Sequence, residues 1–349
     1  MKNIIKTVAF LLIFIMGVCF VDKLYNPGGD GAWFQANTIL DFYKRDKNSI
    51  DVIYAGDSGV YAGISPLEIY ERTGITGYAY STPGQRVWSS YYLIKETMKT
   101  QNPKLVFVET GEFFEKPKNQ DELSIRNAID SLKMSQNKLD MIMDKSYPMT
   151  YYERLTAIFP VMRYHSRWDS LKEYDIRKFR DQAEYTYDGY LLDARITRID
   201  SSENKKEKQA IISNGSKISK ASSEYFKKIK ELCKKNNCTL ILVSMPTPRN
   251  WNQERHDEIQ KLADSENVNF IDMNYDNKIS INWDDDTQDG GDHLNIYGAE
   301  KVGAYLSNYI TSNFDMVNHK EDSKYQRWNN DLVRYNTAKD KKKNQESQN

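Results

Sequence analysis

Short apolar runs separated by helical patterns account for most of the chain. Five runs are rich in β-branched and aromatic residues and end at turn residues, which predicts buried strands. They span 52–55, 77–81, 104–109, 239–244 and 268–273. Apolar residues at helical spacing lie between them, as in 87–99 and 223–235. This alternation predicts an α/β fold built from βαβ units, with a parallel sheet of about five strands.

Between 115 and about 216 the pattern changes. No strong strand is visible there, and 132–143, 151–162 and 170–179 carry helical patterns, with Pro160 expected to bend the second. A hundred residues is far longer than an ordinary connection between elements. We therefore expect a helical cap inserted over the carboxyl edge of the sheet, where long loops are usually functional.

The amino-terminal segment is strongly apolar. Residues 8–21 carry no charge, and Ile4 and Ile5 extend the run past Lys6 to near the roughly 20 residues that a membrane span needs. A cleaved signal peptide is the alternative, but no A-x-A-like cleavage site follows. We interpret 1–25 as a cytoplasmic tip and an uncleaved transmembrane anchor. Lys2 and Lys6 precede the run, which predicts a cytoplasmic amino end and an extracellular domain.

The remaining chain divides into three parts. Residues 26–48 are expected to form a linker and a lead-in helix, and 49–312 the globular domain. The tail 313–349 is polar, and from position 340 onward it has no apolar residue. Such a segment cannot bury enough surface to order itself, so we expect the tail to be partly disordered.

Composition narrows the function class. The chain has 49 basic and 49 acidic residues, which argues against nucleic-acid binding, because that function needs a basic excess. Aromatic residues make up 12% of the chain, which suits a carbohydrate-facing cleft as well as a packed core. Three cysteines form no disulfide framework; Cys233 and Cys238 are interpreted as buried thiols, with a local bridge as the alternative. No histidine lies near them at a zinc spacing, so we predict no metal and no cofactor.

Two distant stretches carry candidate chemistry. Gly56-Asp57-Ser58-Gly59 follows the first strand, where a tight turn can present the Ser58 hydroxyl at the carboxyl edge of the sheet. A serine needs a base to become a nucleophile, and His293 follows Asp289-Gly-Gly-Asp292 just before the last helical pattern. Together they predict a Ser-His-Asp triad. Asp289 is favoured as the acid because a neighbouring side chain normally points away, although a Gly-Gly turn could bring Asp292 inward.

These stretches resemble the SGNH (GDSL-like) hydrolase family over roughly 49–310. The resemblance implies a three-layer sandwich and an oxyanion hole made by the backbone N–H groups of Ser58 and Gly84. The family's Asp-x-x-His spacing is broken here, because Gly290 stands three residues before His293. The family's Asn after the third strand is also absent, and we expect Gln85 to substitute for it.

Within the superfamily the chain looks most like the membrane-anchored DltD-like proteins of Firmicutes and the polysaccharide O-acetyltransferases. A similar His-Ser-Arg-Trp recurs in those proteins, here at 165–168. His165 and Arg167 are therefore candidates to bind a substrate phosphate or carboxylate, or to fasten the cap. Trp251 is expected to line the same edge of the site.

The sequence thus predicts a membrane-anchored, extracytoplasmic serine esterase or O-acyltransferase. Its expected substrate is a cell-envelope polysaccharide or teichoic acid, and the resemblance implies a multipass acyl-exporting membrane protein as a partner. Hydrolysis and transfer begin with the same acyl-enzyme and stay open. The alternative is a catalytically weak SGNH-fold protein that binds or assembles envelope components.

Overall fold

The computed structural model describes residues 2–25, 34–177, 185–199, 215–276 and 278–348. Its strands are β1 (Val52–Ala55), β2 (Gly77–Ala79), β3 (Leu105–Glu109), β4 (Thr239–Ser244) and β5 (Asn269–Asp272). The helices before the insertion are α1 (Lys2–Tyr25), α2 (Phe34–Phe42), α3 (Ser58–Gly63), α4 (Pro66–Thr73) and α5 (Val87–Thr97). The insertion carries α6 (Glu122–Ile129), α7 (Gln136–Met143), α8 (Tyr151–Ile158), α9 (Val161–Tyr164) and α10 (Glu173–Arg177). The last helices are α12 (Lys220–Lys235), α13 (Gln253–Glu266), α14 (Ile296–Asn313) and α15 (Gln326–Glu346), and the 3₁₀ turns are η1 (Gly111–Phe114), η2 (Pro117–Asn119), η3 (His165–Asp169) and η5 (Ser323–Tyr325).

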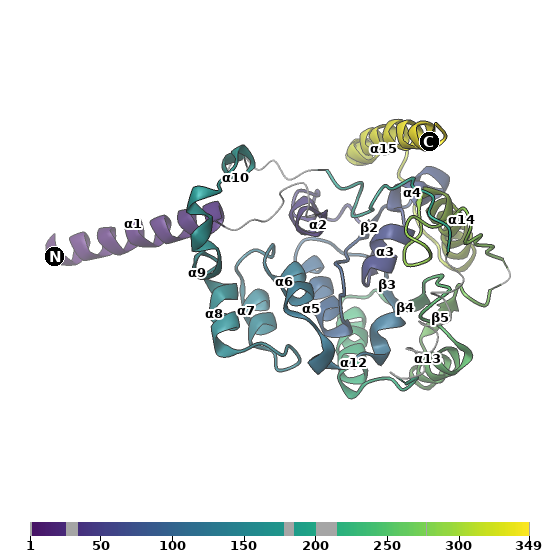
Figure 1. Cartoon of the computed structure of the whole chain (residues 1–349), viewed down its shortest axis with the longest axis horizontal. Helices are drawn as coiled ribbons and strands as arrows, with labels where there is room; N and C mark the ends of the chain where they lie inside the picture. Colours follow the sequence, from purple (N-terminus) through teal and green to yellow (C-terminus); the bar gives the residue numbers. More distant parts are fainter. Residues whose placement is uncertain (1, 26–33, 178–184, 200–214, 277, 349) are drawn as a thin grey trace.

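The five strands form one parallel sheet in the order β2-β1-β3-β4-β5, which confirms the predicted α/β class. Alternate strand side chains enter two separate cores. Ile53 and Val106 pack with α5 and α12 on one face, and Tyr54 and Phe107 pack with α4 and α14 on the other (Figure 1). Burial on both faces explains why the strands are continuous apolar runs.

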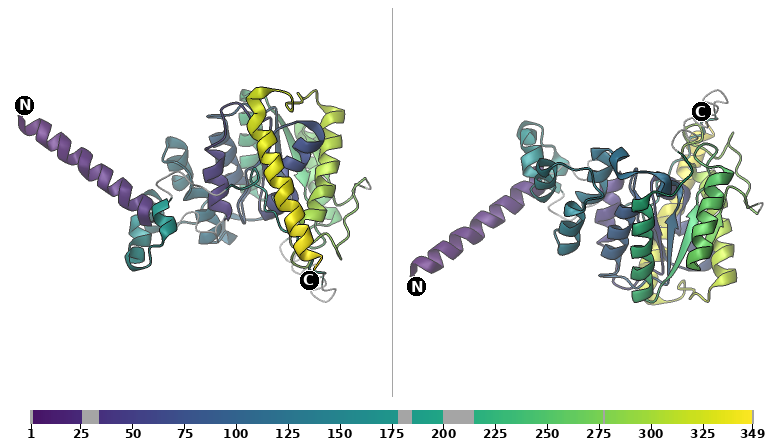
Figure 2. Two further views of the ribbon diagram at one scale, coloured as in Figure 1. Left: turned by 90° about the horizontal axis from the view of Figure 1, so that it is seen from above. Right: turned by 90° about the horizontal axis from the view of Figure 1, so that it is seen from below.

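The insertion lies beside the sheet. Helices α6 and α7 pack against α5, and α8 and α9 follow outward toward the base of α1. Figure 2 shows that α1 projects from this end of the molecule as an isolated rod. Pro160 separates α8 from α9, as the sequence predicted. The described segment of the insertion that reaches the carboxyl edge is instead 185–199. The predicted turn-rich link at 26–31 lies outside the described residues.

The carboxyl-terminal end corrects one expectation. We expected disorder beyond position 340, but α15 continues to Glu346 and packs on α4. Lys339 bonds Glu68 of α4 at 2.9 Å, and Lys343 bonds Glu300 of α14 at 2.7 Å. The polar residues that suggested disorder are thus partners of acids on neighbouring helices, which sequence patterning cannot reveal.

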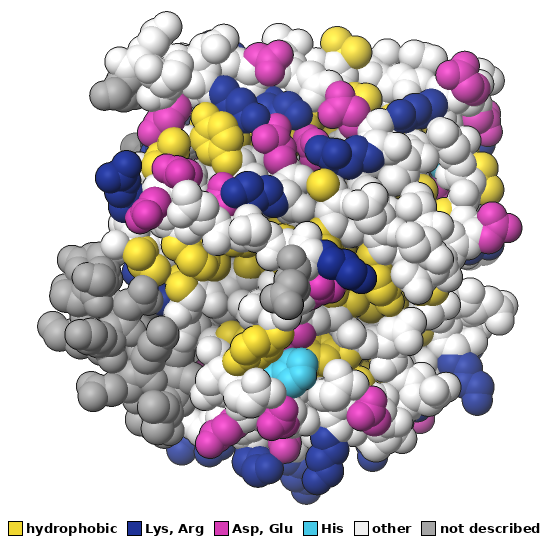
Figure 3. All heavy atoms as spheres, turned by 90° about the vertical axis from the view of Figure 1, so that its right-hand side faces the viewer, with side chains coloured by type: hydrophobic (Ala, Val, Ile, Leu, Met, Phe, Trp, Pro, Cys, Tyr) yellow, Lys and Arg dark blue, Asp and Glu magenta, His cyan; other side chains and the backbone are white. Residues whose placement is uncertain are grey.

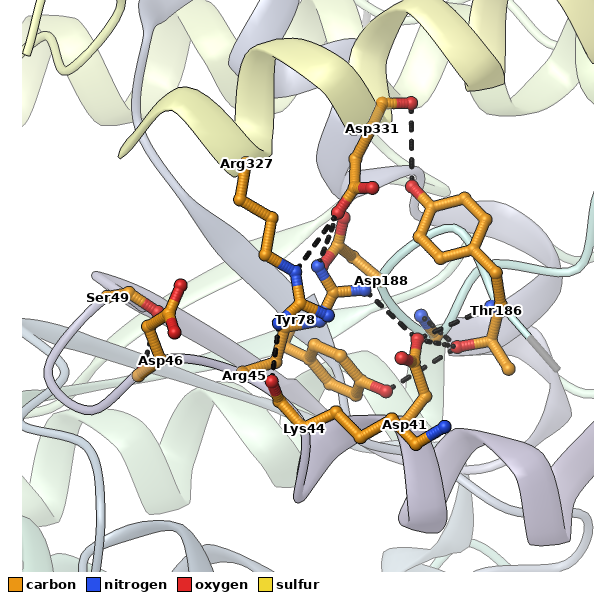
Figure 4. Close-up of polar contacts among 12 residues, drawn as sticks. Asp41, Lys44, Arg45, Asp46, Ser49, Tyr78, Thr186, Asp188, Arg327 and Asp331 are labelled. Carbon is orange, nitrogen blue, oxygen red and sulfur yellow. Dashed lines mark hydrogen bonds and ion pairs between the residues drawn. The ribbon is translucent and has the colours of Figure 1, made fainter. Parts of the chain in front are cut away.

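A buried arginine joins three parts of the chain that are distant in sequence (Figure 4). The guanidinium of Arg45 contacts Asp41 at 3.0 Å, Asp188 at 2.9 Å and Asp331 at 2.7 Å. Its side chain is fully buried. Burial raises the pKa of Asp188 to about 8, against the opposing effect of the Arg45 charge. Three carboxyl groups thus face one buried guanidinium, so the stability of the cluster depends on Arg45.

The same cluster fixes an unusual backbone. Tyr187 and Asp188 have φ values of 48° and 58°, a region that residues other than glycine rarely adopt. Gly189 follows at φ 85°, where a Cβ would lie 2.0 Å from the Ala79 carbonyl oxygen. The Asp188 carbonyl accepts the Ala79 N–H at 2.9 Å, so this turn covers the edge strand β2. From there the chain runs toward the carboxyl edge of the sheet.

We predict that Arg45→Met destabilises the protein by about 3–5 kcal/mol, because it leaves buried carboxylates without their counter-charge. Arg334→Met is the control: Arg334 lies 3.8 Å from Asp331 with 68% of its side chain exposed, and should cost about 0–1 kcal/mol. Urea unfolding of both variants measures the difference. Equal stabilities would contradict the role assigned to Arg45.

Candidate active site

Ser58 occupies the first turn of α3, directly after β1. Asp57 caps this helix, and its Oδ1 accepts the Gly59 N–H at 2.9 Å. The bend requires glycine at position 56, because a Cβ there would lie 2.5 Å from both Glu109 and Val60. Ser58 is half-buried, and as the first helical residue its N–H has no partner within the helix. The turn thus presents a hydroxyl and a backbone N–H at the same edge.

His293 is held by the loop that precedes α14. Thr287 and Leu294 form an isolated antiparallel bridge, so the chain between them closes into a tight turn. Gly290 and Gly291 have φ values of 78° and 101°, which only glycine adopts readily. Asn295 caps α14 by accepting the N–H groups of Tyr297 and Gly298. The His293 imidazole is therefore held by a tight turn directly before the capped start of α14.

The Gly-Gly turn brings Asp289 back to His293. One Asp289 carboxylate oxygen accepts the His293 backbone N–H at 2.8 Å, and the other lies 2.5 Å from His293 Nδ1. The extra residue relative to an Asp-x-x-His spacing is absorbed by the two left-handed glycines. Asp292 is 54% exposed and faces Arg249, with 3.7 Å between Oδ1 and Nη1. In this structure Asp289, rather than Asp292, orients the ring.

His293 faces the start of α3. Its ring is stacked with that of Tyr61, with 6.3 Å between centroids. The charges of His293 and Asp57 act on each other. Asp57 and Tyr61 flank Ser58, so the serine and the histidine lie on the same side of the site. No hydrogen bond between described residues joins the Ser58 hydroxyl to the His293 ring. Asp289 holds Nδ1 of that ring, which leaves Nε2 as the nitrogen that could accept the serine proton.

The charges around His293 favour its protonated form. Burial alone lowers the pKa of His293, but the hydrogen bond and charge of Asp289, with the charges of Asp292 and Asp57, raise it above 6.5. Burial is also the main cause that raises the pKa of Asp57, opposed by the Gly59 N–H and the charge of His293. The histidine is thus a stronger base than a free imidazole, as proton transfer from an alcohol requires.

The side chain of Glu109 lies close to the turn that carries Ser58, and the sequence analysis did not point to it. Glu109, at the end of β3, is 7% exposed and accepts the Gly111 N–H at 2.6 Å. Burial and then the charge of Asp57 raise its pKa well above the usual range. Arg86 pairs with Glu112, in the turn after β3 where an Asn donor was missing. Glycine at position 56, which admits the Glu109 side chain, was the sequence signal for this contact.

Arg249 is another residue that sequence patterning missed. It follows β4, is 6% exposed and donates to the Gly290 carbonyl oxygen at 2.6 Å. From the other side, Thr197 donates its N–H to Thr287 at 3.0 Å and accepts that of Gly290 at 3.0 Å. The segment 185–199 also donates the Leu191 N–H to Tyr61 at 2.7 Å. The histidine loop is therefore clamped between this segment and the end of β4.

Several predicted site residues have other roles. Gln85 is a correction: its amide N–H groups go to Tyr80 and Ser90, and its backbone N–H to Thr82, so it offers no donor to the site. Gly84 has φ 59° in the same loop, and no hydrogen bond of its N–H with a described residue is found. Its predicted part in an oxyanion hole stays a prediction.

His165 and Arg167 lie away from Ser58, near the end of α1, whereas Trp251 lies at the carboxyl edge of the sheet. Arg167 donates to the Tyr25 carbonyl oxygen at 2.7 Å and to Asp175, so it fastens the end of α1. His165 is exposed on the same 3₁₀ turn, η3. The Trp251 indole donates to Asp272 at 2.8 Å, and its ring packs beside Phe114 and Phe270. No hydrogen bond, ion pair or ring contact between described residues joins any of the three to Ser58 or His293.

Asp289, Asp292 and His293 form a group whose ligand atoms lie within 4.8 Å of one another. Ligands of one tetrahedral zinc ion would be about 3.3 Å apart, given bond lengths near 2.0–2.1 Å. The 2.5 Å between His293 and Asp289 is instead a hydrogen-bond distance. This arrangement suits proton transfer better than metal binding.

We predict that Asp289→Asn lowers the pKa of His293, because the effect of burial is then no longer outweighed. Asp292→Asn is the matched control and should lower it less, since Asp292 contributes charge without a hydrogen bond to the ring. NMR titration of the imidazole measures both changes. Equal shifts in the two variants would mean that Asp289 does not orient the ring.

The raised pKa of His293 makes the stability of the fold depend on pH. Because the folded-state pKa of His293 lies above 6.5, protonated His293 contributes stability that is complete below pH 6.5. That contribution is lost as the pH rises through the folded-state pKa, and it should shrink in Asp289→Asn.

Comparisons with known proteins found similarity to solved structures alone. No protein-family model and no curated protein matches the chain. A solved structure of a presumed acylhydrolase from Bacteroides fragilis is similar over 78% of this chain and 93% of its own, at 12% identity and a TM-score of 0.36. A GDSL-like lipase from Bacteroides thetaiotaomicron is similar over 78% and 94%, at 11% identity and a TM-score of 0.35. These TM-scores lie below 0.5, so the chemistry of the candidate site rests on its own residues.

Proposed function

We propose that the chain is a membrane-anchored, extracytoplasmic serine esterase or O-acyltransferase of the SGNH type. The observation that carries the proposal is the meeting of two distant stretches. Asp57 and Tyr61, on either side of Ser58, both interact with His293, and Asp289 holds that ring through Nδ1. A hydroxyl, a base and an orienting acid are the parts of a nucleophilic triad.

In the proposed reaction the Ser58 oxygen attacks the carbonyl carbon of an acyl ester, and its proton passes to His293 Nε2. Asp289 stabilises the imidazolium through Nδ1. The Ser58 and Gly84 N–H groups would bind the oxyanion. The ester C–O bond then breaks, the leaving alkoxide takes the proton from His293, and the acyl group stays on Ser58. A second hydroxyl, of water or of an acceptor, repeats these steps in reverse.

The substrate and location extend the proposal. Helix α1 is 24 residues long, strongly apolar and entirely unburied, which is sufficient to span a membrane. Asp22 accepts the Val161 N–H at 2.8 Å and the Tyr25 carbonyl accepts from Arg167. These contacts tie α1 to the folded domain and favour an uncleaved anchor over a signal peptide. Together with the resemblance to DltD-like proteins, they support an acylated cell-envelope polymer as substrate and an acyl-exporting membrane protein as donor.

A binding or assembly protein on the same frame is the second candidate. The half-buried Asp57 precedes Ser58, and the buried Glu109 packs against the same turn at Gly56, where negative charge would oppose an oxyanion. Phe113 stands where the family has an Asn donor, and its neighbour Glu112 pairs with Arg86. These features favour weak catalysis.

A fluorophosphonate probe separates the two candidates. We expect the full chain to be labelled at Ser58, because a serine activated by a base displaces fluoride from the probe and becomes phosphonylated. Ser58→Ala should abolish labelling, while Ser265→Ala, a serine on α13 far from the site, should leave it unchanged. Absence of label on the folded wild-type chain would favour the binding protein.

A chromogenic acetyl ester then separates hydrolysis from transfer. Asp289→Asn should lower kcat on the order of 10³–10⁴-fold, as expected when the imidazole loses its orienting acid, with Asp292→Asn close to wild type. Acetate release that rises with a glycan acceptor, together with an acetylated product, indicates transfer. Acetate release that does not change when the acceptor is added indicates hydrolysis. Equal activity of Asp289→Asn and Asp292→Asn would contradict the proposed triad.

A further inference from the structure

The largest group of exposed apolar side chains on the described domain surrounds the base of α1. Large hydrophobic side chains that are exposed outside α1 are concentrated in 151–176, on α8, α9, η3 and α10. They are Tyr151 (77% exposed), Tyr152 (60%), Phe159 (43%), Met162 (37%), Trp168 (69%) and Ile176 (60%). We call these six side chains the α8–α10 patch. Four of them are aromatic, and among the other described residues outside α1 only Tyr275 is an exposed aromatic of this kind.

The patch lies at the level where α1 would leave the bilayer. Asp22, the first acidic residue after the apolar run, accepts the N–H of Val161, the residue before Met162. The Tyr25 carbonyl accepts from Arg167, the residue before Trp168. Two patch residues thus follow directly the residues that hold the end of α1. Figures 1 and 2 both show α9 and α10 at the base of the α1 rod.

The character of the patch fits a lipid interface. Tryptophan and tyrosine concentrate at the headgroup level of membranes, where the ring is half apolar and half hydrated. The exposed charged residues between the patch residues are of both signs: Arg163, Lys172, Asp169 and Glu173. Apolar and aromatic contact, rather than attraction to anionic lipid, would therefore carry the binding.

On the face opposite α1, Figure 3 shows basic and acidic side chains spread among hydrophobic ones. An exposed apolar group of this size on a folded domain marks an interaction site. Because the patch is continuous with the apolar helix, its neighbour in the assembled state would be the bilayer that α1 crosses.

We propose that the α8–α10 patch docks onto the outer surface of the bilayer and serves as a second membrane contact beside α1. The inference rests on the proposed anchor role of α1, and it is independent of the chemistry at Ser58. Two contacts instead of one would fix the orientation of the domain relative to the membrane.

The test places an environment-sensitive fluorophore on the full chain in zwitterionic phosphatidylcholine nanodiscs. Cys19→Ser removes the exposed native thiol, and Cys233 and Cys238 are buried. Trp168→Cys carries the label within the patch. Val333→Cys is the matched control: Val333 is also apolar and 66% exposed, but lies on α15.

We expect the label at 168 to emit at shorter wavelength than the label at 333, and to be quenched several-fold more strongly by nitroxide-bearing lipid. The difference should persist at high salt. Equal emission and quenching at the two positions would overturn the proposal. Shielding at 168 that occurs only in membranes of the producing cell, and not in nanodiscs, would identify a membrane protein as the occupant and would also overturn it. Co-flotation of the chain with lipid reports insertion of α1 separately, and fluorophosphonate labelling reports the proposed catalysis.

Discussion

The ion pairs of Arg45 hold together parts of the chain that no local pattern connects. One buried guanidinium binds Asp41 of α2, Asp188 of the inserted region and Asp331 of α15. A buried cation must be matched by acids at close range, because its desolvation costs several kcal/mol. This requirement fixes the positions of all three partners. It also holds the left-handed backbone at Asp188, from which the chain proceeds to the candidate site.

The candidate site depends on that segment. Residues 185–199 contact Tyr61 on one side and the loop of Asp289 and His293 on the other. The acid–base pair is therefore positioned by three independent supports: the segment, Arg249 after β4, and the capped start of α14. Rigid support of this kind keeps catalytic groups within the small tolerances that proton transfer needs.

The candidate site is rich in carboxyl groups. Asp57, Glu109, Asp289 and Asp292 surround one histidine and one serine. The three aspartates together raise the pKa of His293 and strengthen it as a base. The same charge works against an anionic intermediate, so the energetic balance rests on which carboxyl groups are protonated. Burial keeps Glu109 neutral over a wider pH range than a free carboxyl, which reduces the conflict.

The sequence by itself determined the strands, their parallel pairing and the apolar amino-terminal helix, because hydrophobic periodicity and turn residues are local signals. It also singled out Ser58 and His293 as candidates, since glycine-bounded turns mark both. Only the tertiary structure decided that Asp289 rather than Asp292 holds the ring, that the Gln85 amide is consumed within its own loop, and that Arg167 fastens α1. The polar residues of α15 were likewise mistaken for a disordered tail. In each case the deciding partner lies far away along the chain or across a turn, and the pairing of polar groups leaves no periodic trace in a sequence.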